Sequence, residues 1–324
     1  MKFRTEISIS QTNFNITHDC KIAMHGSCFA ENIAMKFANA GFSIDLNPFG
    51  IAYNPLSLSQ NLNRLLDNKP FMENELIKIN DLYHSFSHHS RFSGINPTEV
   101  LEKINSRLEQ SSTFLRTANL LIITFGTAYV YRLQSTGNVV SNCHKLPDKL
   151  FTYKRLTIDE IIGEWNGLII RLQSFNPSLR LLFTVSPIRH WKDGAHENQI
   201  SKSILLLSVD ELIRNHLQCC YFPAYELLMD DLRDYRFYSE DMIHPSLSAI
   251  EYIWNTFANT FFDNKTLKLN AAIDEIVTAK NHRLKNPFSE ESKRFKEEQL
   301  KKIQRIQTHS PHINFEDEIK YFSN

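Results

Sequence analysis

Five short apolar runs, set between longer segments with helical periodicity, constrain this chain more than any other feature. They cover residues 21–25, 42–46, 120–125, 179–185 and 219–222. Each run is continuous rather than alternating, which is typical of parallel strands that are buried on both faces. Because strands that alternate with helices form βαβ units, the sequence predicts a doubly wound α/β domain around a parallel sheet of about five strands.

The segments between these runs supply the predicted helices, over residues 29–40, 98–110, 157–175, 198–217 and 246–262. Two stretches break the alternation. Residues 128–133 and 138–141 flank a Ser-Thr-Gly turn and predict a hairpin inserted after the third strand. Residues 55–92 are polar, His-rich and irregular, and we expect a lid or a binding insert there.

The composition changes near residue 264, where a segment rich in Lys, Arg and Glu begins to replace the apolar pattern. We therefore expect a first domain over residues 1–263 and a helical C-terminal extension over 264–324. A charged helix of this kind is typical of a solvated face rather than of a nucleic-acid-binding arm.

Charge and cysteine content exclude several classes of protein. The 324 residues include 36 Lys or Arg and 36 Asp or Glu, so the formal net charge is zero, which argues against general nucleic-acid binding. No apolar run approaches the ~20 residues of a bilayer span, and the N-terminus lacks a secretory apolar region. Five cysteines, an odd number with no evenly spaced framework, indicate a reducing compartment, and the absence of a C-x-x-C motif argues against a structural zinc site. We expect a cytoplasmic protein with no membrane partner, no metal and no cofactor.

Two small nucleophilic side chains, Ser27 and Cys28, follow Gly26 where the first predicted strand passes into the first helix. Free N–H groups and the positive end of the macrodipole favour negative charge at a helix N-terminus. A thiol ionises more readily there, and an oxyanion finds donors in place. The alternative is a tight turn in which Ser27 caps the helix and Cys28 is a small buried residue.

A second candidate, D-M-I-H-P, covers residues 241–245 just before the last predicted helix. Asp241 lies three residues before His244, so its carboxylate can orient one ring nitrogen and leave the other free to act as a base. By itself the motif is weak, because surface Asp–His pairs are common. Its place late in the chain, opposite a nucleophile after the first strand, strengthens the catalytic interpretation.

These positions carry a resemblance to a known family. G-S-C-F-A at Gly26–Ala30 resembles the signature of the GSCFA family, and the similarity extends over roughly residues 1 to 263. It includes N-P-F-G at 47–50, F-G-T-A at 125–128, N-C-H-K at 142–145, V-S-P at 185–187, Y-F-P-A-Y-E at 221–226 and D-M-I-H-P at 241–245. That family resembles the SGNH/GDSL hydrolases. The resemblance implies a flavodoxin-like three-layer α/β sandwich that hydrolyses or transfers acyl groups, often on carbohydrates and lipids, without a metal.

The resemblance also implies roles for individual residues. In the superfamily the nucleophile is the second residue after the glycine, which is Cys28 here, but its usual residue type is serine, which is Ser27. We favour Cys28 because the geometry of the turn decides which side chain faces the cleft. His244 is the base, oriented by Asp241. The backbone N–H of Gly50 and the backbone at the nucleophile are expected to hold the oxyanion, and Gly126 begins the block expected to supply a further donor. The block that normally carries an Asn donor lacks it, so Thr127 or Asn142 is a possible substitute.

Further candidates lie outside these motifs. Substrate contacts are expected from His88, His89, His144, Arg189, His190 and Lys202. His84 and His88 would share a helical face, which leaves a histidine-based metal hydrolase as an alternative. We predict an esterase or acyltransferase that forms a covalent acyl intermediate on a small-molecule or carbohydrate ester. A catalytically weak relative that binds a saccharide, acyl or protein ligand in the same cleft is the other alternative.

Overall fold

The computed structural model describes residues 4–9, 14–281, 286 and 289–323. Its central element is a five-stranded parallel sheet with the strand order β10-β9-β5-β1-β2. Numbered along the chain, that order is 2-1-3-4-5, the flavodoxin-like arrangement. The five predicted strands and the fold class are therefore confirmed. The strands are β1 (Lys21–Gly26), β2 (Ser43–Leu46), β5 (Leu120–Phe125), β9 (Arg180–Val185) and β10 (Cys219–Tyr221).

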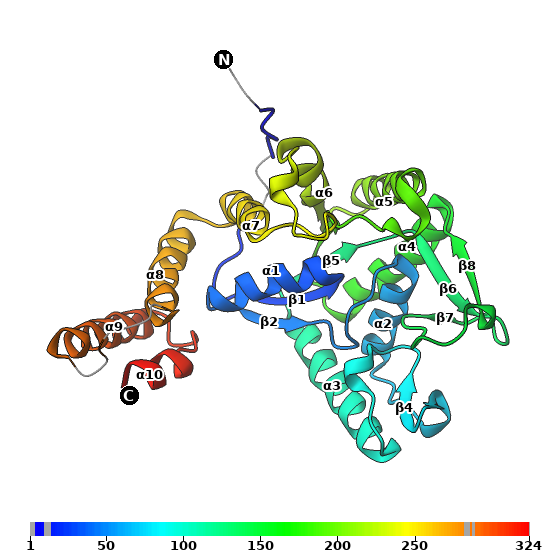
Figure 1. The fold of residues 1–324 in the computed structure, drawn as a ribbon, viewed down its shortest axis with the longest axis horizontal. Helices are drawn as coiled ribbons and strands as arrows, with labels where there is room; N and C mark the ends of the chain where they lie inside the picture. The colour runs from blue at the N-terminus through cyan, green and yellow to red at the C-terminus, as the bar shows by residue number, and fades with distance from the viewer. Residues whose placement is uncertain (1–3, 10–13, 282–285, 287–288, 324) are drawn as a thin grey trace.

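Helices cover both faces of this sheet (Figure 1). Because side chains alternate along a strand, Ile22 and Met24 of β1 pack toward one face, whereas Ala23 packs toward the other. The first face carries α1 (Cys28–Asn39) and α7 (Leu247–Phe261). The second carries α2 (Pro55–Asp67), α3 (Pro97–Thr117), α4 (Ile158–Phe175) and α5 (Gly194–Asn215).

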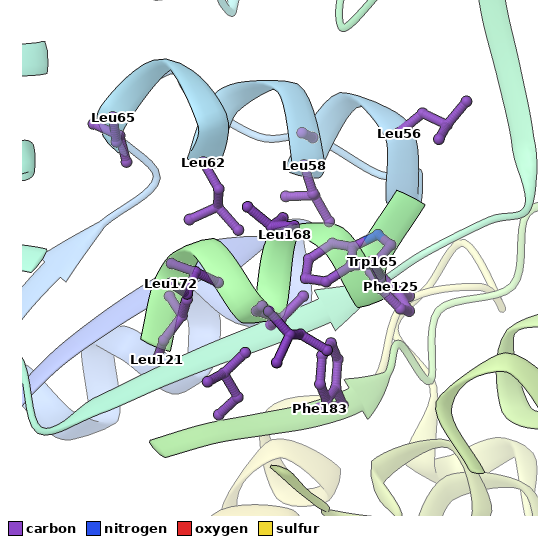
Figure 2. Close-up of a cluster of buried hydrophobic side chains, with 14 of the residues drawn as sticks. Leu56, Leu58, Leu62, Leu65, Leu121, Phe125, Trp165, Leu168, Leu172 and Phe183 are labelled. Carbon is purple, nitrogen blue, oxygen red and sulfur yellow. The ribbon is translucent and has the colours of Figure 1, made fainter. Parts of the chain in front are cut away.

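Helix α2 corrects the prediction of an irregular insert over residues 55–92. Asn54 caps the helix through its side chain and Pro55 occupies the first turn. Leu58, Leu62 and Leu65 follow at helical spacing and are fully buried. Figure 2 shows these leucines packed against α4 above strands β5 and β9. Polar residues are interspersed with these leucines, and several of them, Ser57, Ser59 and Asn61, are buried as well, so the apolar periodicity of the stretch is weak in the sequence.

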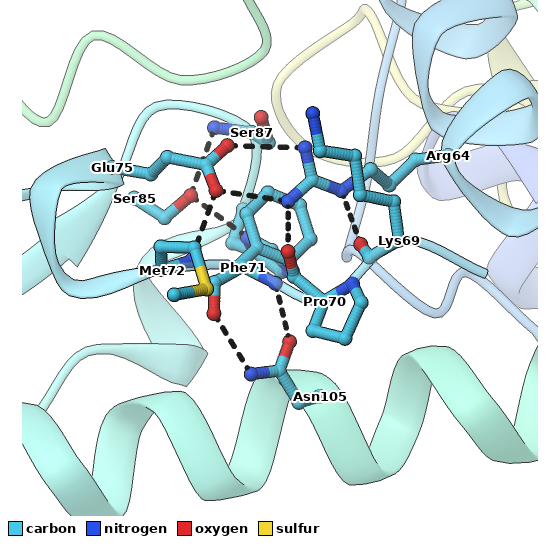
Figure 3. A network of polar contacts seen from close by, with 10 residues as sticks. Arg64, Lys69, Pro70, Phe71, Met72, Glu75, Ser85, Ser87 and Asn105 are labelled. Carbon is cyan, nitrogen blue, oxygen red and sulfur yellow. Dashed lines mark hydrogen bonds and ion pairs between the residues drawn. The ribbon is translucent and has the colours of Figure 1, made fainter. Parts of the chain in front are cut away.

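The rest of that stretch is fastened to α2 and α3 by side chains (Figure 3). The Arg64 guanidinium makes a bidentate contact with Glu75 and stacks 3.8 Å from the centre of the Phe71 ring. Asn105 bonds both the N–H and the carbonyl of Phe71. Along this stretch the chain forms η1 (Glu73–Glu75), the hairpin strands β3 (Leu76–Ile79) and β4 (Leu82–Ser85), and η2 (Ser90–Phe92).

A small antiparallel sheet follows β5. Strands β6 (Tyr129–Leu133) and β7 (Val139–Val140) form the predicted hairpin. A third strand, β8 (Phe151–Arg155), pairs with the other side of β6 and was not predicted. It follows η3 (Asp148–Leu150), and its mixed F-T-Y-K-R sequence carries little apolar signal. A 3-10 turn, η4 (Trp191–Asp193), connects β9 to α5.

The chain ends in helices, as predicted. Short turns α6 (Ala224–Glu226), η5 (Leu227–Asp231) and η6 (Tyr235–Phe237) follow β10 and lead into α7. Beyond α7, the helices α8 (Asn264–Asn281), α9 (Glu290–His309) and α10 (Glu316–Ser323) share a hydrophobic cluster of their own and lie to one side of the α/β body (Figure 1). Within residues 4–9, 14–281, 286 and 289–323, no helix combines the length and apolarity that crossing a bilayer requires.

Candidate active site

A cavity of about 250 Å³ opens where the loops after β1, β5 and β9 meet. This position lies outside the carboxyl ends of the strands and beside the β1–β5 pair, where the strand order reverses; open α/β sheets bind their ligands at such points. The cavity brings both candidate nucleophiles and the candidate base together. Its lining residues are Ser27, Cys28, Tyr53, Gly126, Ser186, Ile188, Arg189, His190, Trp191, Ile243 and His244.

The turn that presents the nucleophiles depends on Gly26. Its φ of +154° lies outside the range that L side chains ordinarily adopt. A Cβ at this position would lie 2.6 Å from the Cβ of Thr124 on the neighbouring strand β5. The N–H of Gly26 is bonded to the Asn47 side chain at 2.8 Å. The end of β1 is thus held tightly against β5, directly before Ser27.

Ser27 is the N-cap of α1, as the structural interpretation predicted. Its Oγ accepts the N–H of Phe29 at 3.3 Å and donates to Ser186 Oγ at 3.2 Å. The residue is only 2% exposed. Both functions of this hydroxyl are therefore engaged within the protein, although the side chain lines the cavity.

Cys28 is the first residue of α1 and is only partly buried, with a free thiol. Its Sγ lies 3.7 Å from the hydroxyl of Tyr53. As the first residue of a helix, its N–H has no carbonyl within the helix to bond, and no acceptor for it occurs in the described part of the chain. Cys28 thus offers the more accessible nucleophile and, beside it, an unpaired backbone donor.

Asp241 and His244 form the pair that the spacing predicted. Asp241 Oδ2 lies 2.5 Å from His244 Nδ1, and Oδ1 accepts the backbone N–H groups of Ile243 and His244 at 2.9 Å. The two backbone donors, followed by the imidazole, lower the pKa of Asp241 to about 2. The carboxylate is therefore charged and favours a proton on Nδ1. Nε2 of His244 has no hydrogen-bond partner among the described residues.

Arg189 supports the loop that carries this pair. Its guanidinium lies between two aromatic rings, 4.8 Å from the centre of Trp191 and 5.0 Å from that of Tyr238. It also donates to the carbonyl of Met242, which has a left-handed φ of +58°. Predicted as a substrate contact, Arg189 both lines the cavity and fastens the Asp241–His244 loop.

His190 lines the same cavity, with its ring edge-on to Tyr53 at 5.4 Å between centroids. Burial, followed by the nearby Lys202 charge, lowers the pKa of His190 to about 4. The imidazole is therefore neutral near pH 7. The backbone N–H of His190 donates to Asn198 Oδ1 at 2.8 Å, so helix α5 holds this part of the rim.

A polar face of α5 lies beneath the cavity, and the sequence analysis missed most of it. Ser201 Oγ accepts the N–H of Ala128 at 2.8 Å and lies 3.2 Å from the hydroxyl of Thr127. Asn198, Ser201 and Lys202 share one helix face at i, i+3 and i+4. That spacing of buried polar residues on an otherwise apolar face, N-x-x-S-K, is the signal that points to them.

Lys202 corrects a prediction. It was expected to contact substrate, but it is 1% exposed, and its ammonium donates to the carbonyls of Gly126 and Ser186, both at 2.7 Å. Among the described residues it has no carboxylate partner. Burial lowers the pKa of Lys202 to about 7. The side chain ties together the loops after β5 and β9 instead of reaching a ligand.

Apart from the backbone at the nucleophile, the predicted oxyanion donors are already occupied. The N–H of Gly50 bonds the Asn47 carbonyl at 2.8 Å, and Gly50 does not line the cavity. The N–H groups of Gly126 and Thr127 both bond the carbonyl of Tyr53, at 2.7 and 3.0 Å. The hydroxyl of Thr127 is engaged by α5. None of these three residues presents a free donor to the cavity.

Gly50 has a packing role instead. Its φ is +88°, and a Cβ there would lie 2.2 Å from the Cβ of His89. This close approach, together with the bond from the His89 N–H to the Phe49 carbonyl, joins the β2–α2 loop to the end of the His-rich segment. Substituting Gly50 would therefore push His89 away.

The remaining candidates gather elsewhere, between the two hairpins. His88 is 1% exposed among phenylalanine rings and bonds Ser85 Oγ at 3.0 Å. His144 bonds the Ser85 carbonyl, and Asn142 Oδ1 accepts the N–H of His144. These three residues and His89 do not line the cavity, so the structure does not place them as substrate or oxyanion contacts. In the part of the chain that is described, no group of three or more His, Cys, Asp or Glu has the arrangement of a metal site.

A family model described as "GSCFA family" matches residues 21–257 of this chain. The chain belongs to the GSCFA family. A second model, described as "GSCFA domain protein, C-terminal domain", matches residues 273–324. Both lie within the ranges predicted for the first domain and the extension, while the division at residue 264 stays a prediction. A search of curated proteins found no match to this GSCFA chain.

Two solved structures are similar to parts of the GSCFA chain. One is a family 3 carbohydrate esterase of Clostridium thermocellum, at 11% identity and a TM-score of 0.36, covering 78% of this chain and 98% of the esterase. The other is a family 3 carbohydrate esterase from Talaromyces cellulolyticus, at 10% identity and a TM-score of 0.34, covering 79% and 99%. At TM-scores this low, neither likeness supports an inference about the site.

Proposed function

We propose that this GSCFA protein is an ester hydrolase or acyltransferase that forms a thioester on Cys28. The observation that carries the proposal is the cavity itself, which is lined by the Cys28 thiol and by a His244 imidazole already oriented by Asp241. A nucleophile, a base and a group that orients the base are the components that acyl transfer requires.

The reaction begins when His244 accepts the thiol proton and the sulfur attacks the ester carbonyl, forming a C–S bond. The tetrahedral intermediate then collapses, the ester C–O bond breaks, and the imidazolium gives its proton to the leaving alcohol. In the second half, His244 deprotonates water or an acceptor hydroxyl, which attacks the thioester and releases the acyl product. The sulfur recovers its proton from the imidazolium, so the cycle closes without a redox partner.

Ser27 is the weaker candidate for the nucleophile. Its hydroxyl caps α1 and donates to Ser186, so attack would require both interactions to be given up. A second function is favoured by a different observation: the occupied N–H groups of Gly50 and Gly126 are what a relative that binds its ligand without turnover would show. The two functions differ in whether a covalent adduct forms.

The experiment is intact-mass analysis of the full chain after exposure to p-nitrophenyl acetate. We expect one acetyl adduct on the wild type, the same adduct on Ser27→Ala, and none on Cys28→Ala. Loss of the adduct in Ser27→Ala with its retention in Cys28→Ala would assign the reaction to Ser27. A wild type that binds esters yet never carries an adduct would favour the binding function.

A further inference from the structure

Acyl transfer through Cys28 places negative charge on the former carbonyl oxygen, and that charge needs hydrogen-bond donors. The unpaired N–H of Cys28 is one donor. The backbone donors expected from Gly50, Gly126 and Thr127 are engaged elsewhere. A side chain that lines the cavity can supply a second donor.

We infer that the hydroxyl of Tyr53 is this second donor, a conclusion that rests on the proposed function of Cys28. Of the side chains that line the cavity, only that of Tyr53 has a polar atom in contact with the Cys28 sulfur, at 3.7 Å. An oxyanion donor acts from about 2.7–3.1 Å of the oxygen, which lies one bond beyond the carbon attached to sulfur. A hydroxyl 3.7 Å from the sulfur can satisfy that geometry.

Two other polar side chains of the cavity, Ser186 and Arg189, hydrogen-bond within the protein. Ser186 Oγ receives the hydroxyl of Ser27 and the N–H of Ile188. The Arg189 guanidinium packs against the Trp191 and Tyr238 rings and donates to the Met242 carbonyl, while its buried Nε has no hydrogen-bond partner among the described residues. The Tyr53 hydroxyl contacts the Cys28 thiol itself and has no other hydrogen-bond partner among the described residues. Its donor is therefore free to turn to a substrate oxygen.

The backbone carbonyl of Tyr53, which occupies the N–H groups after β5, also holds Tyr53 in position. Its carbonyl accepts the N–H groups of Gly126 and Thr127, and the next residue, Asn54, caps α2. A Cβ on Gly126 would lie 3.0 Å from the Tyr53 carbonyl, so the glycine permits this close approach. Because of this contact, the N–H groups after β5 cannot donate to a ligand, whereas the phenol of Tyr53, from the segment before α2, faces the cavity.

Protonation is consistent with a donor role. Burial, followed by the neighbouring thiol, raises the pKa of Tyr53 above that of an exposed phenol. The ring is held edge-on to the neutral His190. The phenol therefore keeps its proton at neutral pH and can donate a hydrogen bond that strengthens as charge develops on the oxygen.

The test compares two reactions of the same sulfur in the Tyr53→Phe variant, which keeps the ring and removes only the hydroxyl. Acylation by p-nitrophenyl acetate passes through an oxyanion, whereas alkylation by iodoacetamide does not. We expect the acylation rate constant to fall roughly 10²–10³-fold and the alkylation rate constant to remain within about threefold of the wild type. Tyr83→Phe is the matched control, because its hydroxyl lies outside the cavity.

Each other outcome overturns the inference in a distinguishable way. Equal falls in both rates would mean that Tyr53 acts on the thiol and not on the oxyanion. If the wild type is acylated and Tyr53→Phe is acylated at the same rate, Tyr53 is not an oxyanion donor, and the proposed function of Cys28 still holds. A wild type that is alkylated but never acylated would overturn the proposed function and the inference together.

Discussion

The two sides of the cavity are built in contrasting ways. The sheet-edge side, with Ser27, Gly126 and Ser186, rests on the buried ammonium of Lys202. The loop side presents Asp241 and His244, whose side chains are 47% and 45% exposed. Burial makes the first side part of the folding core, whereas the second is held by a few local bonds. We therefore expect substitutions on the sheet-edge side to affect mainly stability, and substitutions of Asp241 and His244 to affect mainly turnover.

The largest expected effect is on the loop side. His244→Ala should lower ester turnover about 10²–10⁴-fold, because it removes the general base. The free energy of unfolding should change by less than about 0.5 kcal/mol, as at other exposed positions. Burst-phase acylation and denaturant unfolding check the two parts. Asp241→Asn should reduce turnover less, since it affects orientation rather than proton transfer, and a large loss of stability in either variant would break the contrast.

Lys202→Met tests the sheet-edge side. Two buried carbonyls lose their donor, at about 1–3 kcal/mol each, and this loss is partly offset because a charge is no longer buried. We expect a net destabilisation of about 2 kcal/mol in urea unfolding at pH 7.

The folded pKa of Lys202, about 7, is below the ordinary value of 10.5, so the unfolded chain binds more protons between these values. The free energy of unfolding of the wild type, relative to that of Lys202→Met, should therefore increase as the pH rises from 7 to 9, by at most about 1.4 kcal/mol per pH unit. A constant difference would show that Lys202 does not titrate there.

His88 extends the comparison to a buried residue that does not line the cavity. Burial, followed by the charges of Arg64 and His144, lowers the pKa of His88 to about 3, below the ordinary 6.5. As the pH falls from 6.5 toward 3, the unfolded chain takes up a proton that the native state resists, so stability is lost, by at most about 1.4 kcal/mol per pH unit. His88→Phe should flatten this acid dependence relative to the wild type without changing acylation. Parallel curves for the two proteins would contradict the assignment.

The smallest expected effect belongs to Ser27, on the sheet-edge side. Ser27→Ala removes the N-cap of α1 and should cost about 1 kcal/mol of stability. Alkylation of Cys28 by iodoacetamide should continue at nearly the wild-type rate. Thermal unfolding with quantified alkylation measures both. A variant as stable as the wild type would show that the cap interaction with the Phe29 N–H contributes little.

Local features of this protein followed from the sequence. The five strands were recognisable because a parallel strand buried on both faces must be continuously apolar. The Ser27 cap and the Asp241–His244 pair were also predictable, because their partners lie within three residues in the chain. Helix α2 was missed since its buried leucines are interspersed with polar residues, several of which, such as Ser59 and Asn61, are themselves buried, so the apolar periodicity is weak.

Tertiary structure alone decided which donors the site can use. Whether the N–H of Gly126 is free depends on the Tyr53 carbonyl, 73 residues earlier, and whether Lys202 reaches a ligand depends on the loops after β5 and β9. Hydrogen bonds of this kind join segments that are far apart in the sequence and share no local pattern. Residue type and spacing therefore identify candidate donors, but not which of these donors already have partners in the folded chain. The sequence by itself determined the parallel sheet, through its apolar runs, and the local motifs. Packing decided that Tyr53 and Cys28 share a cavity, because only the folded chain brings the segment before α2 against the first turn of α1.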